Sequence, residues 1–86
     1  MLESKIKSIC CDQLEKWGWL VNHIIQCNNN GWPDTEIFRN GIMYLIEFKQ
    51  PGVAPRKLQS YRHRKLQEQG FKTFVVTSLK DIEPLR

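Results

Sequence analysis

The chain of 86 residues is long enough for one modest hydrophobic core and too short for a second, so we expect a single domain over residues 1–86. Its apolar content of 41% places it among folded globular proteins rather than disordered polypeptides. The formal net charge of +4 favours a polyanionic partner, although only modestly.

The three cysteines, Cys10, Cys11 and Cys27, are odd in number and lack the CxxC spacing of a zinc or redox site. We therefore expect reduced thiols, with Cys10 and Cys11 in or near the core. Reduced thiols favour an intracellular, cytoplasmic protein, which would be nucleoid-associated if its host is bacterial. No apolar run approaches the roughly 18 residues of a membrane span, and the first residues lack the apolar region of a signal peptide. We expect no contact with a membrane.

The first part of the chain predicts a helix and then a strand. Residues 3–17 carry apolar side chains at helical spacing with charged residues largely on the other side, which predicts an amphipathic helix that ends at Gly18. Residues 19–26 mix β-branched and aromatic residues in a run too short for a helix. This run predicts a strand, followed by a turn over residues 28–31.

The central stretch, Pro33–Lys49, predicts a β-hairpin. Two short apolar-rich runs meet at Asn40-Gly41, a dipeptide that tolerates positive φ at both positions and is a strong signal for a tight turn. Pairing around this turn would bring Asp34, at the far end of one strand, level with Glu47 on the other.

The last part of the chain predicts a helix, a strand and a short closing element. Residues 50–52 close the hairpin, and a helix runs from Ala54-Pro55 to about Gln69 before Gly70. Residues 71–77 predict a strand, after which Ser78 can cap a short turn or helix through residue 81. The resulting order, α-β-β-β-α-β, predicts an α/β fold with helices packed on a mixed sheet.

The ends of the hairpin strands carry a cluster of charge. Glu47 and Lys49 point to one face of their strand, about 6–7 Å apart along the backbone, while Phe48 points to the other face with the apolar residues. One interpretation of Asp34, Glu47 and Lys49 is a salt-bridged strand end without further function. The other is a divalent metal site, because Mg²⁺ takes oxygen ligands and keeps several waters, so that two carboxylates and the backbone carbonyl of Phe48 would suffice.

The second predicted helix has a polar face and a basic stretch. Gln59, Arg62, His63 and Leu66 share one face at 100° per residue, which is unusually polar for a helix that packs on a sheet. We expect His63 to be partly exposed on the helix, with a phosphate contact as the alternative. The basic residues are candidates for contacts to a DNA backbone rather than to bases, and they are Arg56, Lys57, Arg62, Arg64 and Lys65, with His63 beside them.

The charged hairpin matches a known nuclease signature. Pro33-Asp34, a gap of twelve residues and Glu47-Phe48-Lys49 resemble the PD-(D/E)XK motif. The resemblance extends to the VRR-NUC (virus-type replication-repair nuclease) branch, whose pattern is matched over nearly the whole chain by Gly31-Trp32-Pro33-Asp34, Ile46-Glu47-Phe48-Lys49, Pro51-Gly52, Gln59, Leu66, Gly70 and the strand Thr73–Ser78. The chain therefore resembles a stand-alone VRR-NUC domain with a restriction-endonuclease-like core.

The resemblance assigns roles to the residues of the hairpin. Asp34 and Glu47 would bind Mg²⁺ or Mn²⁺, Phe48 would add its carbonyl oxygen, and Lys49 would be the catalytic lysine. The same resemblance implies hydrolysis of a phosphodiester bond by water, with 5′-phosphate and 3′-hydroxyl ends.

Two further residues match the family on the helices. Gln59 matches the glutamine of the second helix, which helps to shape the active site, and we count it with the catalytic residues. Glu3 matches an acidic residue of the first helix near the metal, although a helix N-terminal charge that suits the dipole is an equal alternative. Among the tryptophans, Trp32 lies beside the site and is the candidate for base stacking, whereas Trp17 and Trp19 are expected in the core or an interface.

The sequence thus predicts a Mg²⁺- or Mn²⁺-dependent endodeoxyribonuclease without a small-molecule cofactor. So small a chain has little surface for sequence readout, and stand-alone members resemble archaeal Holliday-junction resolvases, which favours four-way or other branched DNA and a homodimer. Three alternatives stay open: a less selective DNA nuclease, a non-catalytic nucleic-acid-binding module that retains the fold, and an assembly subunit indifferent to metal and DNA.

Overall fold

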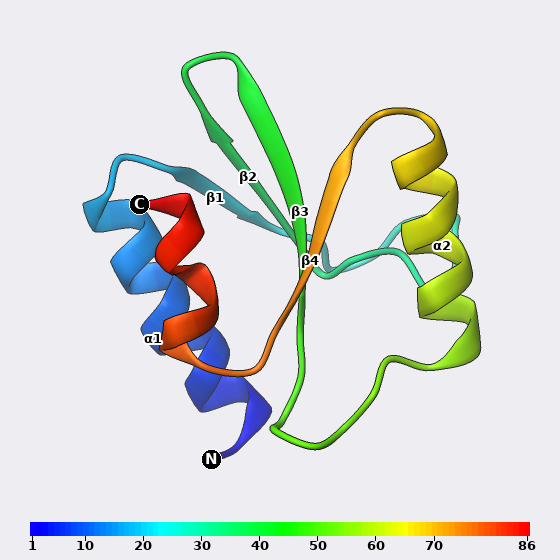
Figure 1. Cartoon of the computed structure of the whole chain (residues 1–86), viewed down its shortest axis with the longest axis horizontal. Helices are drawn as coiled ribbons and strands as arrows, with labels where there is room; N and C mark the ends of the chain where they lie inside the picture. Colours follow the sequence, from blue (N-terminus) through cyan, green and yellow to red (C-terminus); the bar gives the residue numbers. More distant parts are fainter.

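The computed structural model describes all of residues 1–86 and confirms the predicted element order, including a short helix after the last strand (Figure 1). The elements are α1 (Glu3–Lys16), β1 (Leu20–His23), β2 (Thr35–Arg39), β3 (Ile42–Phe48), α2 (Lys57–Glu68), β4 (Lys72–Val76) and the 3₁₀ helix η1 (Leu79–Leu85).

The four strands form one mixed sheet in the order β1-β2-β3-β4. β1, β2 and β3 are antiparallel neighbours, and β4 returns parallel to β3 after the α2 crossover. The predicted hairpin is confirmed, because β2 and β3 pair from Arg39 opposite Ile42 outward, and the turn residues Asn40 and Gly41 have φ angles of 52° and 78°. This turn therefore fixes which residues of β2 and β3 lie opposite each other.

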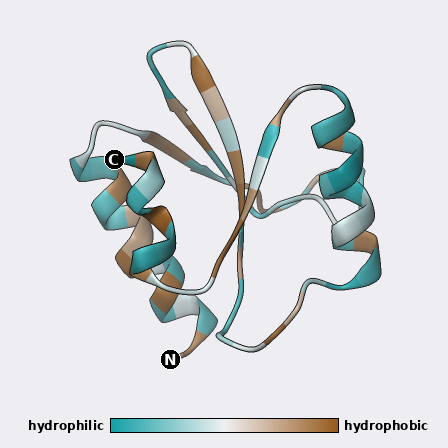
Figure 2. Cartoon of the chain, in the orientation of Figure 1, coloured by the Kyte–Doolittle hydropathy of each residue, from teal (hydrophilic) through white to brown (hydrophobic).

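The helices lie on both faces of the sheet. α1 and η1 pack together on one face, and α2 lies on the other, where β4 is the strand that it contacts (Figure 1). The apolar core lies on the α1 side and contains Ile46 and Phe48 of β3, together with Cys10 and Cys11 as predicted. The brown apolar segments of Figure 2 follow the strands and α1, whereas α2 is mostly teal. The two faces therefore differ in kind, one apolar and the other largely polar.

The first strand is shorter than residues 19–26, because its paired residues end with His23 opposite Thr35. Ile24 still donates its N–H to the Asp34 carbonyl at 2.8 Å, which is the last backbone hydrogen bond between the two segments.

Both later helices also differ from their predicted bounds. α2 begins at Lys57 rather than at Ala54-Pro55, with Arg56 as an extended N-cap residue. The closing helix runs to Leu85 because Ile82 and Leu85 enter the core. The predicted cap by Ser78 is wrong, since its side chain makes no capping hydrogen bond.

The turn before η1 is held by another side chain. Asp81 Oδ2 accepts hydrogen bonds from the N–H of Thr77 at 2.8 Å and from its hydroxyl at 3.1 Å. None of the helices is both long enough and apolar enough to cross a membrane.

Candidate active site

The two hairpin carboxylates meet at the end of the sheet, on the face away from the core. Thr35 pairs with Ile46, so the next residue outward on each strand brings Asp34 level with Glu47, as predicted. Glu47 and Lys49 are buried, at 4% and 7% exposure, and Lys49 Nζ lies 3.9 Å from Glu47 Oε2. Two carboxylates and an ammonium group therefore converge at one point.

Asp34 is held in place by its neighbours on both strands. Its Oδ1 accepts the hydroxyl of Thr35 at 2.8 Å, and its Oδ2 accepts the N–H of Phe48 at 3.3 Å. The N–H and carbonyl of one strand residue point to the same side, so the Phe48 carbonyl also faces the side of Asp34. The three oxygen ligands expected from the sequence are thus on one side of β3.

Glu47 is incompletely satisfied. Its Oε1 is buried and has no hydrogen-bond partner. Burial, and next the charge of Asp34, raise the pKa of Glu47 to about 7, and Lys49 offsets only part of this effect. An acceptor oxygen without a donor, next to a second carboxylate, is the arrangement that a bound cation would stabilise.

A divalent cation fits these donors by chemistry. The donors are hard oxygens, which suit Mg²⁺ or Mn²⁺. The structure contains no cluster of three or more His, Cys, Asp or Glu side chains arranged to hold a metal. A cation here would therefore rest on Asp34, Glu47 and the Phe48 carbonyl, with water completing its coordination.

The first helix brings two charged residues to this end of the sheet. Lys7 Nζ lies 3.9 Å from Asp34 Oδ1, a contact that the sequence analysis missed. The local signal was weak: Lys7 follows Glu3 by one helical turn on the same side of α1. Glu3 is exposed at the start of α1, and its charge adds to the rise in the pKa of Glu47.

The second helix presents its polar face to the site, as predicted. Gln59 and His63 are its two buried residues, and Gln59 Oε1 accepts the N–H of Arg56 at 2.8 Å. The expectation that His63 is partly exposed is wrong: it is 7% exposed, its Nε2 has no partner, and burial lowers its pKa. This burial places His63 beneath the site rather than on a surface that reaches DNA.

The basic residues of α2 divide into two groups. Arg56 lines the site, and Arg62 donates its Nε–H to the Asn30 carbonyl at 2.9 Å. Lys57, Arg64 and Lys65 are exposed, and the cationic groups of Arg64 and Lys65 lie 5.7 and 5.6 Å from the centre of the exposed Tyr61 ring.

The loop that carries Asp34 is packed tightly against α2. A Cβ added at Gly31 would lie 2.8 Å from the Leu58 carbonyl oxygen, so no other residue fits without a shift. Gly31 also has a φ of 82°, which favours glycine. With the Arg62 hydrogen bond to Asn30, this contact fixes the loop to α2.

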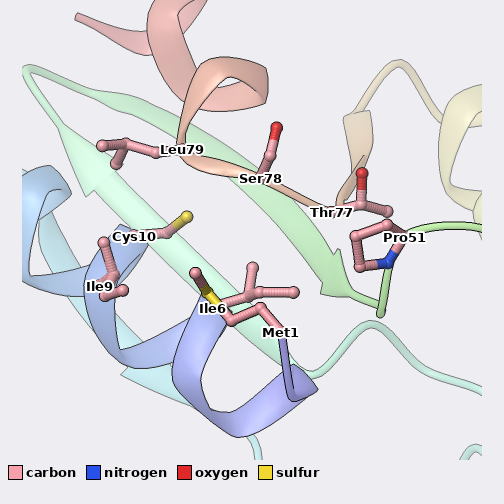
Figure 3. Close-up of a pocket in the computed structure, with 8 residues that line it drawn as sticks. All are labelled: Met1, Ile6, Ile9, Cys10, Pro51, Thr77, Ser78 and Leu79. Carbon is pink, nitrogen blue, oxygen red and sulfur yellow. The ribbon is translucent and has the colours of Figure 1, made fainter.

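A pocket of about 410 Å³ opens between this loop and α2. Trp32 and Gly31 of the loop line it together with Leu58 and Gln59 of α2, and Asp34 and Glu47 also line it. A separate cavity of about 290 Å³ lies between α1 and the start of η1, and Ile6, Cys10 and Leu79 line it (Figure 3). That cavity is apolar and burial raises the pKa of Cys10 to about 11, so the chemistry belongs to the polar pocket.

Comparison with known proteins identifies the class of domain. No protein-family model matches the sequence, and no curated protein sequence does either. Among solved structures, a chain titled "VRR_NUC domain" is 25% identical, superposes with a TM-score of 0.85, and the match covers 96% of this chain and 91% of that one. A "VRR_NUC domain protein" is 14% identical with a TM-score of 0.80, covering 99% and 84%.

These likenesses confirm the resemblance to VRR-NUC domains that the sequence predicted. The chain is a small α/β domain of the VRR-NUC fold, and hence a nuclease-type domain. Asp34, Glu47 and Lys49 lie together in it, at the end of its hairpin.

The close approach of Gly31 to α2 can be tested against a matched glycine. Gly52 has a φ of 83° but no atom within 4 Å of its Cβ position. Gly52→Ala should therefore cost only the backbone strain, about 1–2 kcal/mol of unfolding free energy. Gly31→Ala should cost about 1–3 kcal/mol more because of the clash with Leu58. Equal losses for the two variants in urea unfolding would contradict the contact.

The raised pKa of Glu47 predicts a pH-dependent penalty in the protein freed of divalent ions by chelator. Between its ordinary pKa of 4.5 and about 7, the folded state binds more protons than the unfolded state, so stability should fall as pH rises and level off above 7. The penalty should reach about 3 kcal/mol relative to Glu47→Gln, which cannot titrate. Unfolding curves of the two proteins between pH 4 and 8.5 measure it, and parallel pH profiles would contradict the prediction.

Proposed function

We propose that the protein is a metal-dependent DNA endonuclease whose cation is Mg²⁺ or Mn²⁺. The observation that carries the proposal is the buried, unpartnered Oε1 of Glu47 beside Asp34, in a polar pocket of a VRR-NUC-type domain. A carboxylate in this position destabilises the protein unless a cation offsets it.

The residues divide the work as follows. Asp34, Glu47 and the Phe48 carbonyl hold the cation, which when bound supplies Lewis acidity to a water molecule and to a phosphate oxygen. Lys49, fixed 3.9 Å from Glu47, orients water and offsets phosphate charge. Water adds to phosphorus and gives up a proton, the bond from phosphorus to the 3′ oxygen breaks, and that oxygen takes up a proton in turn, so that no net proton is needed to form the 3′-hydroxyl.

The helix α2 supplies the remaining contacts. Gln59 holds the start of the helix through the Arg56 N–H and shapes the pocket. The guanidinium of Arg56 meets a phosphate at the rim, while Lys57, Arg64 and Lys65 contact the DNA backbone further out. These are charge contacts, which position DNA without reading its sequence.

We further propose that the substrate is branched DNA, with four-way junctions preferred, cut by a homodimer. The 86-residue domain offers little surface for base readout, so DNA shape is the better basis for selectivity. Leu20 and Phe38 are cross-strand partners on the sheet face away from the core, and both are exposed because α2 contacts only β4. A second copy would cover this apolar pair.

Cleavage assays test the nuclease proposal. Labelled linear, flapped and four-way DNA are incubated with Mg²⁺, Mn²⁺ or chelator. We expect cleavage of branched DNA only with metal, and a loss of about 10²- to 10⁴-fold in Asp34→Ala and in Lys49→Ala. Asp12→Ala, which changes an exposed acid of α1, is the control and should cleave as the wild type does.

The outcomes separate the alternatives. Binding without cleavage under every metal would contradict the nuclease proposal and favour a non-catalytic module. Equal cleavage of linear and branched DNA would contradict only the junction preference. Indifference to both metal and DNA would favour an assembly subunit.

Sedimentation velocity tests the dimer. The wild type should sediment as a dimer at assay concentrations, and Leu20→Glu or Phe38→Glu should shift it to a monomer of unchanged circular dichroism. Leu79→Glu, which changes an exposed apolar residue of η1, should leave the dimer intact. A monomeric wild type would contradict the proposal.

A further inference from the structure

The pocket beside the carboxylates has room for more than a phosphate group and a cation. Its volume of about 410 Å³ lies within the roughly 300–1,000 Å³ of sites that enclose small organic ligands. It is lined by Glu47 and Asp34 as well as by residues of the loop and α2, so a group placed in it would lie next to whatever binds the carboxylates.

The walls of this pocket are fixed before any ligand binds. Gly31 packs against the Leu58 backbone with no space for a Cβ, and Asn30 is bound by Arg62. On α2, the Gln59 side chain is held because its Oε1 accepts a hydrogen bond from the N–H of Arg56. A pocket held open in this way costs its ligand little reorganisation, which is typical of a binding site rather than a gap in packing.

The chemistry of the walls suits a nucleobase. Trp32 offers an aromatic surface for stacking, and Leu58 adds apolar surface to the same pocket. Gln59 Oε1 is occupied by the Arg56 N–H, which leaves the amide NH₂ to donate to an acceptor on the base edge. Arg56 lies at the same pocket, where a phosphate next to the base would meet it.

Only an unpaired base can reach such a pocket. In a continuous duplex each base is stacked between its neighbours and paired, so moving it into the pocket costs free energy. The cost is small for a base that is already unpaired, as in a flap or a gap. Stacking on Trp32 would then strengthen the binding of these DNAs but not the binding of intact duplex.

We infer that the pocket formed by Trp32, Leu58 and Gln59 binds the base of an unpaired nucleotide adjacent to the phosphate that is cleaved. This inference rests on the proposed nuclease function and gives it a substrate class: DNA that is unpaired at the cut. Trp32 acts as a specificity-determining residue, and selectivity for DNA with unpaired nucleotides arises within one subunit.

The inference is tested by measuring whether the effect of removing a DNA base depends on the presence of Trp32, which we call the coupling between the base and Trp32. The cut in a flapped DNA is mapped, and an abasic residue then replaces the unpaired nucleotide on either side of it. Affinity is measured by fluorescence anisotropy with Mg²⁺ in a Lys49→Ala background, in which cleavage should be about 10²- to 10⁴-fold slower. Removing the base on one side should weaken binding about 5- to 150-fold in the presence of Trp32 and have no further effect in Trp32→Ala.

Two controls separate stacking from folding. Trp32→Phe should retain most of the coupling because it keeps an aromatic ring, and Phe71→Ala removes an exposed aromatic residue elsewhere and should leave the coupling unchanged. Independent, additive losses from base removal and Trp32→Ala would overturn the inference, as would equal binding of intact and abasic DNA.

A failure of the base-pocket inference can be distinguished from a failure of the nuclease proposal. If the wild type cleaves DNA with metal but no coupling is found, only the base pocket is overturned. If no DNA is cleaved, the abasic residue is scanned along the unpaired strand, and coupling there would support the pocket while the nuclease proposal fails. Absence of DNA binding would overturn both.

Discussion

The register of the β2–β3 pair is the constraint on which the site depends. Each step along one strand fixes the residue opposite, and the pairing of Arg39 with Ile42 and of Thr35 with Ile46 makes Asp34 the neighbour of Glu47. A slip of one residue would turn Glu47 and Lys49 toward the core and Phe48 toward the site. The Asn40-Gly41 turn prevents the slip, because both residues adopt the positive φ that a two-residue hairpin requires. A turn at one end of the sheet therefore sets the chemistry at the other.

The second helix is held by a different kind of contact. Its buried residues are Gln59 and His63 rather than leucine or valine, so it gains little from the apolar burial that fixes α1. Two contacts with the loop before β2 compensate: the steric fit of Gly31 to Leu58 and the hydrogen bond from Arg62 to Asn30. The polar face costs stability and leaves polar groups available at the pocket, which is the usual trade between stability and function.

Sequence patterns predicted the features that are determined by residues close together in the chain. The hairpin, the level placement of Asp34 and Glu47, and the buried side of α2 all follow from alternation, turn residues and helical spacing. What escaped prediction depends on contacts between distant residues. Lys7 reaches Asp34 only because α1 passes that end of the sheet, and its place one turn after Glu3 is only a weak local signal of this contact.

The ends of the helices and strands also depend on contacts between distant residues, which the sequence did not predict. η1 extends to Leu85 because the Trp19 indole donates to the Leu85 carbonyl at 2.8 Å inside the core, 66 residues away along the chain. β1 ends at His23, opposite Thr35, and this register with the later strand is not apparent from the residues of β1 alone. His63 was expected to be partly exposed, yet its spacing from Gln59 places it on the buried side of the helix.

The charge balance of the site argues against a purely structural role. Two lysines face two carboxylates, Lys7 with Asp34 and Lys49 with Glu47, so the formal charges cancel. Both pairs stand at 3.9 Å, well beyond the roughly 2.7–2.9 Å of a charge-assisted hydrogen bond. Neither lysine satisfies Glu47 Oε1. A site selected for stability would close these distances or replace Glu47 by a neutral residue, because a buried ion pair is worth its desolvation only with good geometry. The loose pairs keep the carboxylates in position and leave an oxygen free, which supports a site prepared for a cation that is not part of the chain.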